Sequence, residues 1–209
     1  ADDSEQDNQY TRAGQYLETF IAEGALKQDD QPMFYAYVQD FTIAGQVYRR
    51  SGFVGLGKLE EFGSGVQPHE KTLSGPKADR LKLFKAKAAN LGQIFMLYDD
   101  PEKVADTIIE KAAKNEALIE FTDETGVSHK LYPINDAGDI GKIEGIMADK
   151  TTTIADGHHR YETALNYYRE TANPAAAYRM MTFVNMRNSG LVVLPTHRLV
   201  KNLENRSEE

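Results

Sequence analysis

The chain carries the stretch TTTIADGHHRYETAL from Thr151 to Leu165. Its first five residues favour a β-strand, Asp156-Gly157 favours a tight turn, and the residues from His158 onward have helical spacing. The first N–H groups of a helix have no intrahelical partner and lie at the positive end of the helix dipole. The stretch therefore predicts a strand, a turn and a helix whose N-terminus binds a phosphate or a carboxylate. Asp156 is the candidate N-cap, and Gly157 would let the ligand approach the backbone closely.

Helical spacing divides the side chains after the turn into two groups. The apolar stripe, which we expect to pack inward, consists of Tyr161, Ala164, Leu165 and Tyr168. The basic first turn lies off this stripe and consists of His158, His159 and Arg160. Cations at a helix N-terminus oppose the dipole unless an anion offsets them, which favours an anion site. The alternative is an ordinary turn followed by exposed first-turn side chains.

Length and charge limit the classes of protein to consider. The 209 residues are enough for one large domain or two small ones. The formal net charge of -8 argues against nucleic acid as a partner, since such binding uses clustered lysine and arginine. We expect one compact unit over residues 1–209, a fragment of a longer protein, with sub-parts at 1–78 and 79–209. An oligomer is left open.

The composition also bears on the compartment. The chain has no cysteine, which excludes disulfides, thiolate metal ligands and a cysteine nucleophile. It has no run of about 18 apolar residues, and its start lacks the basic and apolar blocks of a signal peptide. We therefore expect a soluble, cytoplasmic protein with no membrane partner.

Hydrophobic periodicity and turn residues predict an α+β fold, with mixed sheets and packed helices. Helices are predicted over 10–25, 79–90, 101–115, 136–148 and 158–170, with Pro101 opening the third. Strands are predicted over 33–41, 47–59, 94–98, 117–123, 127–133, 151–155, 178–184 and 191–194. A loop without secondary structure of its own is expected over 61–77.

This long loop carries a second group of polar residues, His69, Glu70, Lys71 and Thr72. Their spacing from Gly65 matches a phosphate-binding P-loop, but Glu70 stands where glycine is needed and Pro68 removes a backbone donor. A Walker motif is therefore rejected. Loops of this length are usually functional or mobile, so both a functional loop and a solvated surface loop stay open.

The histidines do not predict zinc. His158 and His159 are adjacent, and neighbouring helical residues diverge by about 100°, whereas two-histidine helical sites use a spacing of three or four. His197 is a third ligand only if the fold brings it close. Mg²⁺ bridging a carboxylate and a bound phosphate is the favoured metal, and no zinc is expected.

Five stretches together resemble a bacterial and archaeal family, the domain of unknown function 1015. They are the residues 31–62, 66–84, 93–100, 151–170 and 191–204. Within them stand QPMFYAYVQDF, VQPHEKTLSGP, QIFMLYDD, ADGHHRYETAL and LVVLPTHRLV. The resemblance covers nearly the whole chain.

The nucleotide-binding box of the ParB and sulfiredoxin superfamily resembles the run from Ile154 to Arg160, which implies a ParB/sulfiredoxin-like strand-turn-helix unit. Free-serine kinases of that superfamily carry a comparable Asp-Gly-His-His-Arg and transfer phosphate from a nucleotide to serine. By this resemblance Asp156 would bind Mg²⁺ or handle the phosphoryl centre. The residues that would cradle phosphates are Gly157, His158, His159 and Arg160. Sulfiredoxin chemistry is excluded because it needs a cysteine.

The expected function is a nucleotide-binding phosphotransferase or nucleotide hydrolase acting on a small hydroxyl-bearing metabolite, with Mg²⁺ and a nucleotide such as ATP or ADP. The candidate catalytic residues are Asp156, His159 and Glu70, with Glu70 in place of the upstream glutamate of the serine kinases. The other candidate nucleotide-binding residues are His69, Lys71, Thr72, His197 and Arg198. The alternatives are a non-catalytic regulatory module of ParB-like type that binds a nucleotide and a scaffold whose junction binds nothing.

Overall fold

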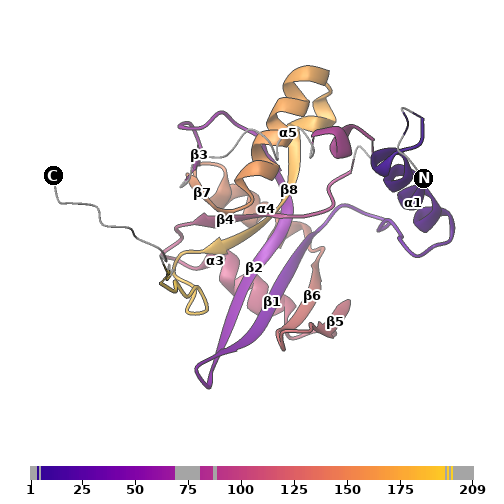
Figure 1. Ribbon diagram of the computed structural model, residues 1–209. Coiled ribbons are helices and arrows are strands. Elements are labelled where there is room, and N and C mark those ends of the chain that lie inside the picture. Colours follow the sequence, from indigo (N-terminus) through magenta and orange to yellow (C-terminus); the bar gives the residue numbers. More distant parts are fainter. Residues whose placement is uncertain are drawn as a thin grey trace, which may run out of the picture.

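An eight-stranded mixed sheet organises the computed structural model, which describes residues 4, 6–68, 81–86, 89–195, 197 and 199 (Figure 1). The strands are β1 (Phe34–Ile43), β2 (Gln46–Lys58), β3 (Val66–Gln67), β4 (Ile94–Tyr98), β5 (Ile119–Thr122), β6 (Ser128–Ile134), β7 (Thr152–Asp156) and β8 (Tyr178–Asn185). Their order is β3-β7-β4-β8-β2-β1-β6-β5. Strands from 79–209 lie between β3 and the β2–β1 pair of residues 1–78, so both sub-parts share one sheet.

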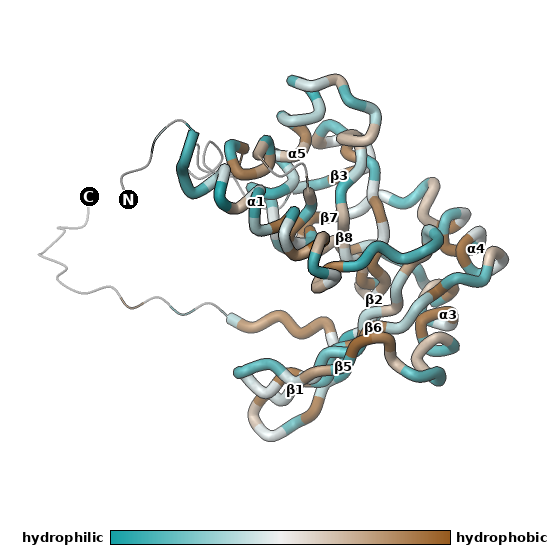
Figure 2. The backbone as a smooth tube through the Cα atoms, turned by 90° about the vertical axis from the view of Figure 1, so that its right-hand side faces the viewer, coloured by the Kyte–Doolittle hydropathy of each residue, from teal (hydrophilic) through white to brown (hydrophobic). Residues whose placement is uncertain are grey.

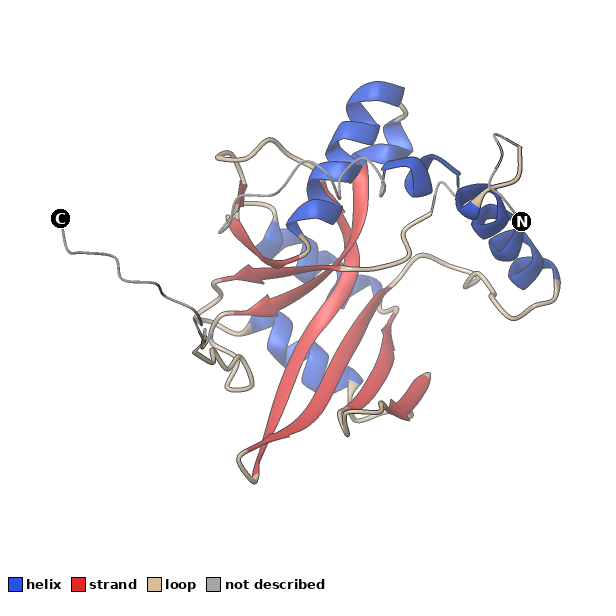
Figure 3. Ribbon diagram, viewed as in Figure 1, coloured by secondary structure: helices blue, strands red, loops and turns tan. Residues whose placement is uncertain are grey.

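The helices complete the α+β fold, which confirms the predicted class. They are α1 (Gln9–Ala22), α3 (Val104–Ala112), α4 (Ala137–Met147), α5 (His158–Thr171), a short helix over 81–86 and the 3-10 helix η1 (Pro174–Ala177). Helices α3 and α4 lie together on one face of the sheet (Figures 2 and 3). In the described part of the chain, no helix combines the length and apolar character needed to cross a membrane.

The core lies between the sheet and helices α3 and α4. Strand β4 contributes one face to this core, because its alternate residues Ile94, Met96 and Tyr98 are fully buried. Phe53 of β2 stacks on Phe183 of β8 with ring centroids 5.0 Å apart. Each such side chain contributes about 1.5–3 kcal/mol through burial. The strands near the candidate site are therefore held from one side by packing.

One predicted helix start and one predicted strand are wrong. Pro101 does not open a helix, because the carboxylate of Asp100 accepts a hydrogen bond from Val104 N at 2.8 Å and the helix begins there. Residues 191–195 form no strand. Both edges of β8, the strand before them, are already paired, with β2 on one side and β4 on the other. The sequence also gave no sign of β3, a two-residue strand in the expected loop.

Candidate functional site

The junction between β7 and α5 has the strand-turn-helix form that the sequence predicts. Strand β7 ends at Asp156, and α5 begins at His158. The N-cap is Gly157 rather than Asp156, so that expectation is wrong. Gly157 has φ 96°, a left-handed backbone that favours glycine, and an added Cβ would lie 2.8 Å from Nε of Arg160. The turn therefore needs a glycine for its conformation and for its space.

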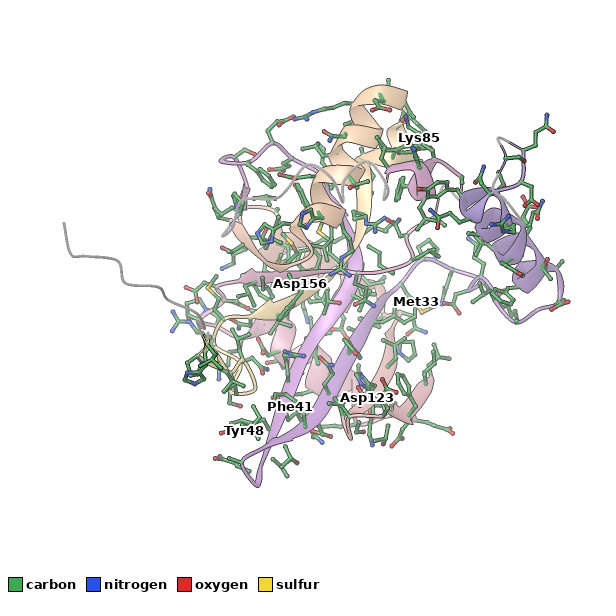
Figure 4. The ribbon with its side chains drawn as sticks, viewed as in Figure 1. Met33, Phe41, Tyr48, Lys85, Asp123 and Asp156 are labelled. Carbon is green, nitrogen blue, oxygen red and sulfur yellow. The ribbon has the colours of Figure 1, made fainter. Side chains whose placement is uncertain are left out.

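A register shift in the sheet decides where Asp156 points. Met96 of β4 pairs with Ile154, yet the preceding residue Phe95 pairs with Asp156 instead of Ala155. Side chains alternate along a strand, so this extra residue moves Asp156 onto the face that Phe95 occupies. Figure 4 shows Asp156 beneath α5, on the side of the sheet away from α3 and α4. The β-bulge therefore places the Asp156 side chain on the same face of the sheet as Phe95.

Helix α5 is anchored by its apolar stripe. Tyr161, Ala164 and Leu165 are buried as predicted, and the Tyr161 hydroxyl accepts from Glu60 N at 2.8 Å and donates to Glu60 O at 2.9 Å. His158 is also buried, with 1% of its surface exposed, which contradicts the reading of both histidines as exposed first-turn residues. The helix N-terminus is consequently fixed against the loop that follows β2.

Two arginines approach the same short segment beside this N-terminus. Arg160 forms an ion pair with Asp156, and its Nη1 lies 3.4 Å from a Cβ built on Gly92. Arg179, at the start of β8, donates to Gly92 O at 3.1 Å and to the side chain of Asn90. The two guanidiniums therefore lie near each other, and among the described residues only Arg160 has a carboxylate partner, Asp156.

Arg179 is the more constrained of the two. It is 4% exposed, and its guanidinium carbon lies 5.1 Å from the ring centre of Phe84. Burial, with the charge of Arg160 as a lesser cause, lowers the pKa of Arg179 to about 10. Both causes disfavour the cation, and a bound anion would remove part of the cost.

Three buried nitrogen atoms at this place have no hydrogen-bond partner in the described part of the chain. They are Nε2 of His159, Nε of Arg160 and Nε of Arg179. Buried polar atoms in proteins nearly always have partners, so an unsatisfied group needs an explanation. A bound anion would supply acceptors for the two guanidiniums, and these atoms accordingly mark the junction as the candidate site.

A pocket of about 190 Å³ adjoins the junction on the face that Asp156 shares with Phe95. Its lining comes from five strands and the residue before β4: Tyr37, Gln39, Arg50, Gly52, Gln93, Phe95, Asp156, Thr182 and Val184. Arg50 stands among them with its guanidinium carbon 5.2 Å from the ring centre of Phe95. Asp156 therefore belongs both to the helix junction and to a pocket with a second cation.

A larger cavity, of about 870 Å³, lies on the opposite side of the sheet beside α4. Its apolar lining includes Met33, Phe53, Met96, Ile143, Met181 and Phe183. None of the candidate site residues that the structure describes lines it. We prefer the junction as the candidate site because buried hydrogen-bond donors without partners in the described chain lie there. The lining of the larger cavity is mainly apolar.

The structure places only part of the predicted site. Asp156, Gly157, His158, His159 and Arg160 lie together at the junction. His197 is exposed to solvent. The remaining candidates lie outside the described residues: His69, Glu70, Lys71, Thr72 and Arg198. Among the residues that the structure describes, no group of three or more His, Asp or Glu side chains is arranged to hold a metal ion.

Sequence reasoning missed both Arg179 and Arg50. For Arg179 a signal existed, because it is in phase with the buried residues Met181 and Phe183 along β8, and a charge in that phase is unusual. For Arg50 no such signal existed. It follows Arg49 directly, and nothing in the sequence says which of two adjacent arginines faces the pocket.

Comparison with known proteins adds the family. The family model described as "Protein of unknown function (DUF1015)" matches residues 1–209. The chain belongs to this family, as its motifs indicated. No curated protein and no solved structure matches the chain significantly.

Proposed function

We propose that the β7–α5 junction binds the phosphate groups of a nucleotide. The observation that carries the proposal is the approach of Arg160 to the buried Arg179 at Gly92. In the described part of the chain, Asp156 pairs with Arg160, and Arg179 has no carboxylate partner. Arginine forks match phosphate oxygens with paired hydrogen bonds. The N-terminus of α5 adds backbone N–H groups to the same place.

The proposal extends to chemistry through the likeness of the motif to the ParB and sulfiredoxin superfamily and its free-serine kinases. On that basis the protein is a nucleotide-dependent phosphotransferase that acts on a small hydroxyl-bearing metabolite. The acceptor's hydroxyl oxygen bonds to the terminal phosphorus of ATP, the bond to the bridging oxygen breaks, and ADP leaves. The hydroxyl proton passes to a carboxylate base, for which Glu70 remains the candidate from the sequence.

The described residues fit the Mg²⁺ that such a reaction uses. The side chain of Asp156 is 72% exposed and so can supply a carboxylate oxygen beside the proposed phosphates. Protein-bound Mg²⁺ commonly takes one or two carboxylates and completes its shell with substrate phosphates and water. When bound, the metal would neutralise the charge that develops on the phosphates. His159 and Arg160 would orient the phosphates, and Arg179 would hold them from the β8 side.

A thermal-shift measurement tests the binding part. ATP, ADP and inorganic phosphate, each with and without Mg²⁺, are expected to raise the Tm of the wild-type protein. Arg179→Met should abolish this rise, whereas Arg187→Met should keep it, because Arg187 is exposed and pairs with Asp99 beyond the end of β8. If Arg179→Met does not fold, Arg160→Ala and its same-helix control Arg169→Ala make the same comparison. No Tm rise with any of the three compounds would contradict the proposal.

Transfer is tested separately, by following labelled phosphate from ATP to a panel of free amino acids and hydroxy acids. Asp156→Asn is expected to abolish product while the protein stays folded. An unchanged rate would remove Asp156 from the mechanism. If the folded wild-type protein binds nucleotide but forms no phosphorylated product, the result would instead support a nucleotide-binding regulatory module.

A further inference from the structure

The pocket beside Asp156 contains a cation that has no acidic partner among the residues that the structure describes. Arg50 of β2 is half-buried and near Phe41 and Phe95, with its guanidinium carbon 5.5 Å and 5.2 Å from their ring centres. Among the described residues its hydrogen-bond partner is Gln39, whose Oε1 accepts from Nε at 3.0 Å and from Nη2 at 2.8 Å. The neutral amide fixes the guanidinium without neutralising it.

The neighbouring residue on the same strand, Arg49, is a cation that does have an acidic partner. Arg49 points away from the pocket and forms a two-bond ion pair with Asp40, at 2.7 Å and 2.8 Å. Burial lowers the pKa of Arg50, whereas the bond to Asp40 raises the pKa of Arg49. In the described part of the chain, the half-buried Arg50 is therefore the arginine of this pair that lacks a counter-ion.

Guanidinium geometry leaves one edge of Arg50 open for a ligand. Gln39 takes Nε and one N–H of Nη2, so Nη1 and the second N–H of Nη2 remain. Two parallel N–H groups match the two oxygens of a carboxylate. The rings of Phe41 and Phe95 lie close to the guanidinium carbon and restrict the directions from which a ligand can approach it.

The rest of the pocket restricts the ligand further. Its volume of about 190 Å³ is roughly six times the share of one water molecule in the liquid, which suits a molecule of about six non-hydrogen atoms. Asp156 lies on the pocket wall and disfavours a second anionic group near it. Thr182 and Gln93, which are hydrogen-bonded to each other, offer the polar groups that a hydroxyl would use.

We propose that this pocket binds a small hydroxy acid, with its carboxylate on Arg50 and its hydroxyl toward Asp156. Binding of the acid stands on the pocket alone. Its identity as the acceptor of the phosphoryl group rests on the proposed function. The pocket and the phosphate site would then share Asp156, which lines one and pairs with Arg160 in the other.

The test uses glycolate, L-lactate and D-glycerate as probes, and glycolamide as the uncharged analogue of glycolate. NMR of ¹⁵N-labelled protein, recorded without nucleotide or Mg²⁺, follows the arginine Nε–Hε signals, with the Arg50 signal assigned by its loss in Arg50→Gln. The hydroxy acids are expected to shift the Arg50 signal saturably, and glycolamide to leave it in place. Malonate, with two carboxylates, is expected to bind more weakly than lactate.

Variants separate this site from a general attraction of anions. Binding, followed by calorimetry, should weaken at least about tenfold in Arg50→Gln and stay within about twofold in Arg49→Gln. Arg50→Lys keeps the charge but lacks the fork, so an intermediate loss is expected and gives a second reading if Arg50→Gln does not fold. Absence of saturable binding, or equal binding by both glutamine variants, would overturn the proposal. Acid binding without phosphate transfer would overturn only the function proposed above.

Discussion

The guanidinium of Arg160 pairs with the carboxylate of Asp156 across the first turn of α5. The cation proposed to bind phosphate and the carboxylate proposed to bind Mg²⁺ therefore hold each other. A phosphate that takes over Arg160 would release Asp156. Nucleotide binding would in this way prepare the carboxylate for the metal, and the order of the two events follows from a single ion pair.

Removing the Asp156 carboxylate should consequently increase the affinity for phosphate when no metal is present. Asp156→Asn is expected to strengthen the binding of inorganic phosphate without Mg²⁺ by about 1.4- to 5-fold, the worth of an exposed ion pair. Calorimetric titration of wild type and variant measures the ratio. Weaker phosphate binding by the variant would show that Asp156 supports the anion instead of competing with it.

Gly157 should resist substitution for two reasons. Gly157→Ala places a side chain at φ 96° and brings its Cβ to 2.8 Å from Nε of Arg160, so we expect a loss of at least about 1–2 kcal/mol in stability and a loss of phosphate binding. Gly126→Ala is the matched control, because Gly126 has φ 84° but nothing within 4 Å of a built Cβ. Chemical denaturation of both variants measures the difference. Equal losses would mean that backbone strain, not contact with Arg160, sets the cost.

The hydrogen bonds between Tyr161 of α5 and the backbone of Glu60 are expected to stabilise the fold. Tyr161→Phe removes the hydroxyl that serves both Glu60 N and Glu60 O, leaving two part-buried backbone groups without that partner. A loss of about 1–3 kcal/mol is expected, which lowers the Tm by several degrees. Tyr48→Phe, which loses one exposed bond to Gln46 at 3.1 Å, should change the Tm little. A Tyr161→Phe protein as stable as wild type would show that ring packing alone anchors the helix.

Part of the loss of stability at low pH should come from protonation of Asp123, at the other end of the sheet. The hydrogen bond from His129, then those from Thr125 and Val127, hold the pKa of Asp123 well below its usual range. A carboxylate with a lowered folded-state pKa stabilises the protein above its unfolded pKa of about 3.9, and this contribution is lost as the pH falls below that value. Wild type should therefore be more stable than Asp123→Asn at pH 7, and the gap should narrow below about pH 4. Urea unfolding at both pH values measures the gap, and a constant gap would rule the explanation out.

Local patterns were sufficient for the elements that carry the site. The short apolar run over 94–98 predicted the bounds of β4 without error, and the turn signal at Asp156-Gly157 placed the start of α5 at His158. The period of α5 also identified Tyr161, Ala164 and Leu165 as its inward face. These features depend on neighbours within a few residues, so the sequence contains what is needed to predict them.

The partners of the site were not predictable in the same way. Arg179 lies 19 positions after Arg160 in the chain, and Arg50 lies 106 positions before Asp156. They reach the junction because β8 pairs with both β4 and β2, a pairing between distant segments. Nothing local fixes such a pairing, since it depends on which strands bury their apolar faces together.

The sequence by itself determined a strand, a glycine turn and a basic first helical turn, because backbone preferences and side-chain period act over short distances. Only the tertiary structure decided how these groups are used. A one-residue bulge against Phe95 moved Asp156 onto the pocket face, packing buried His158, and sheet pairing set Arg179 beside Arg160. Charges and donors from separate strands make a site only once the sheet has set their distances and removed them from water.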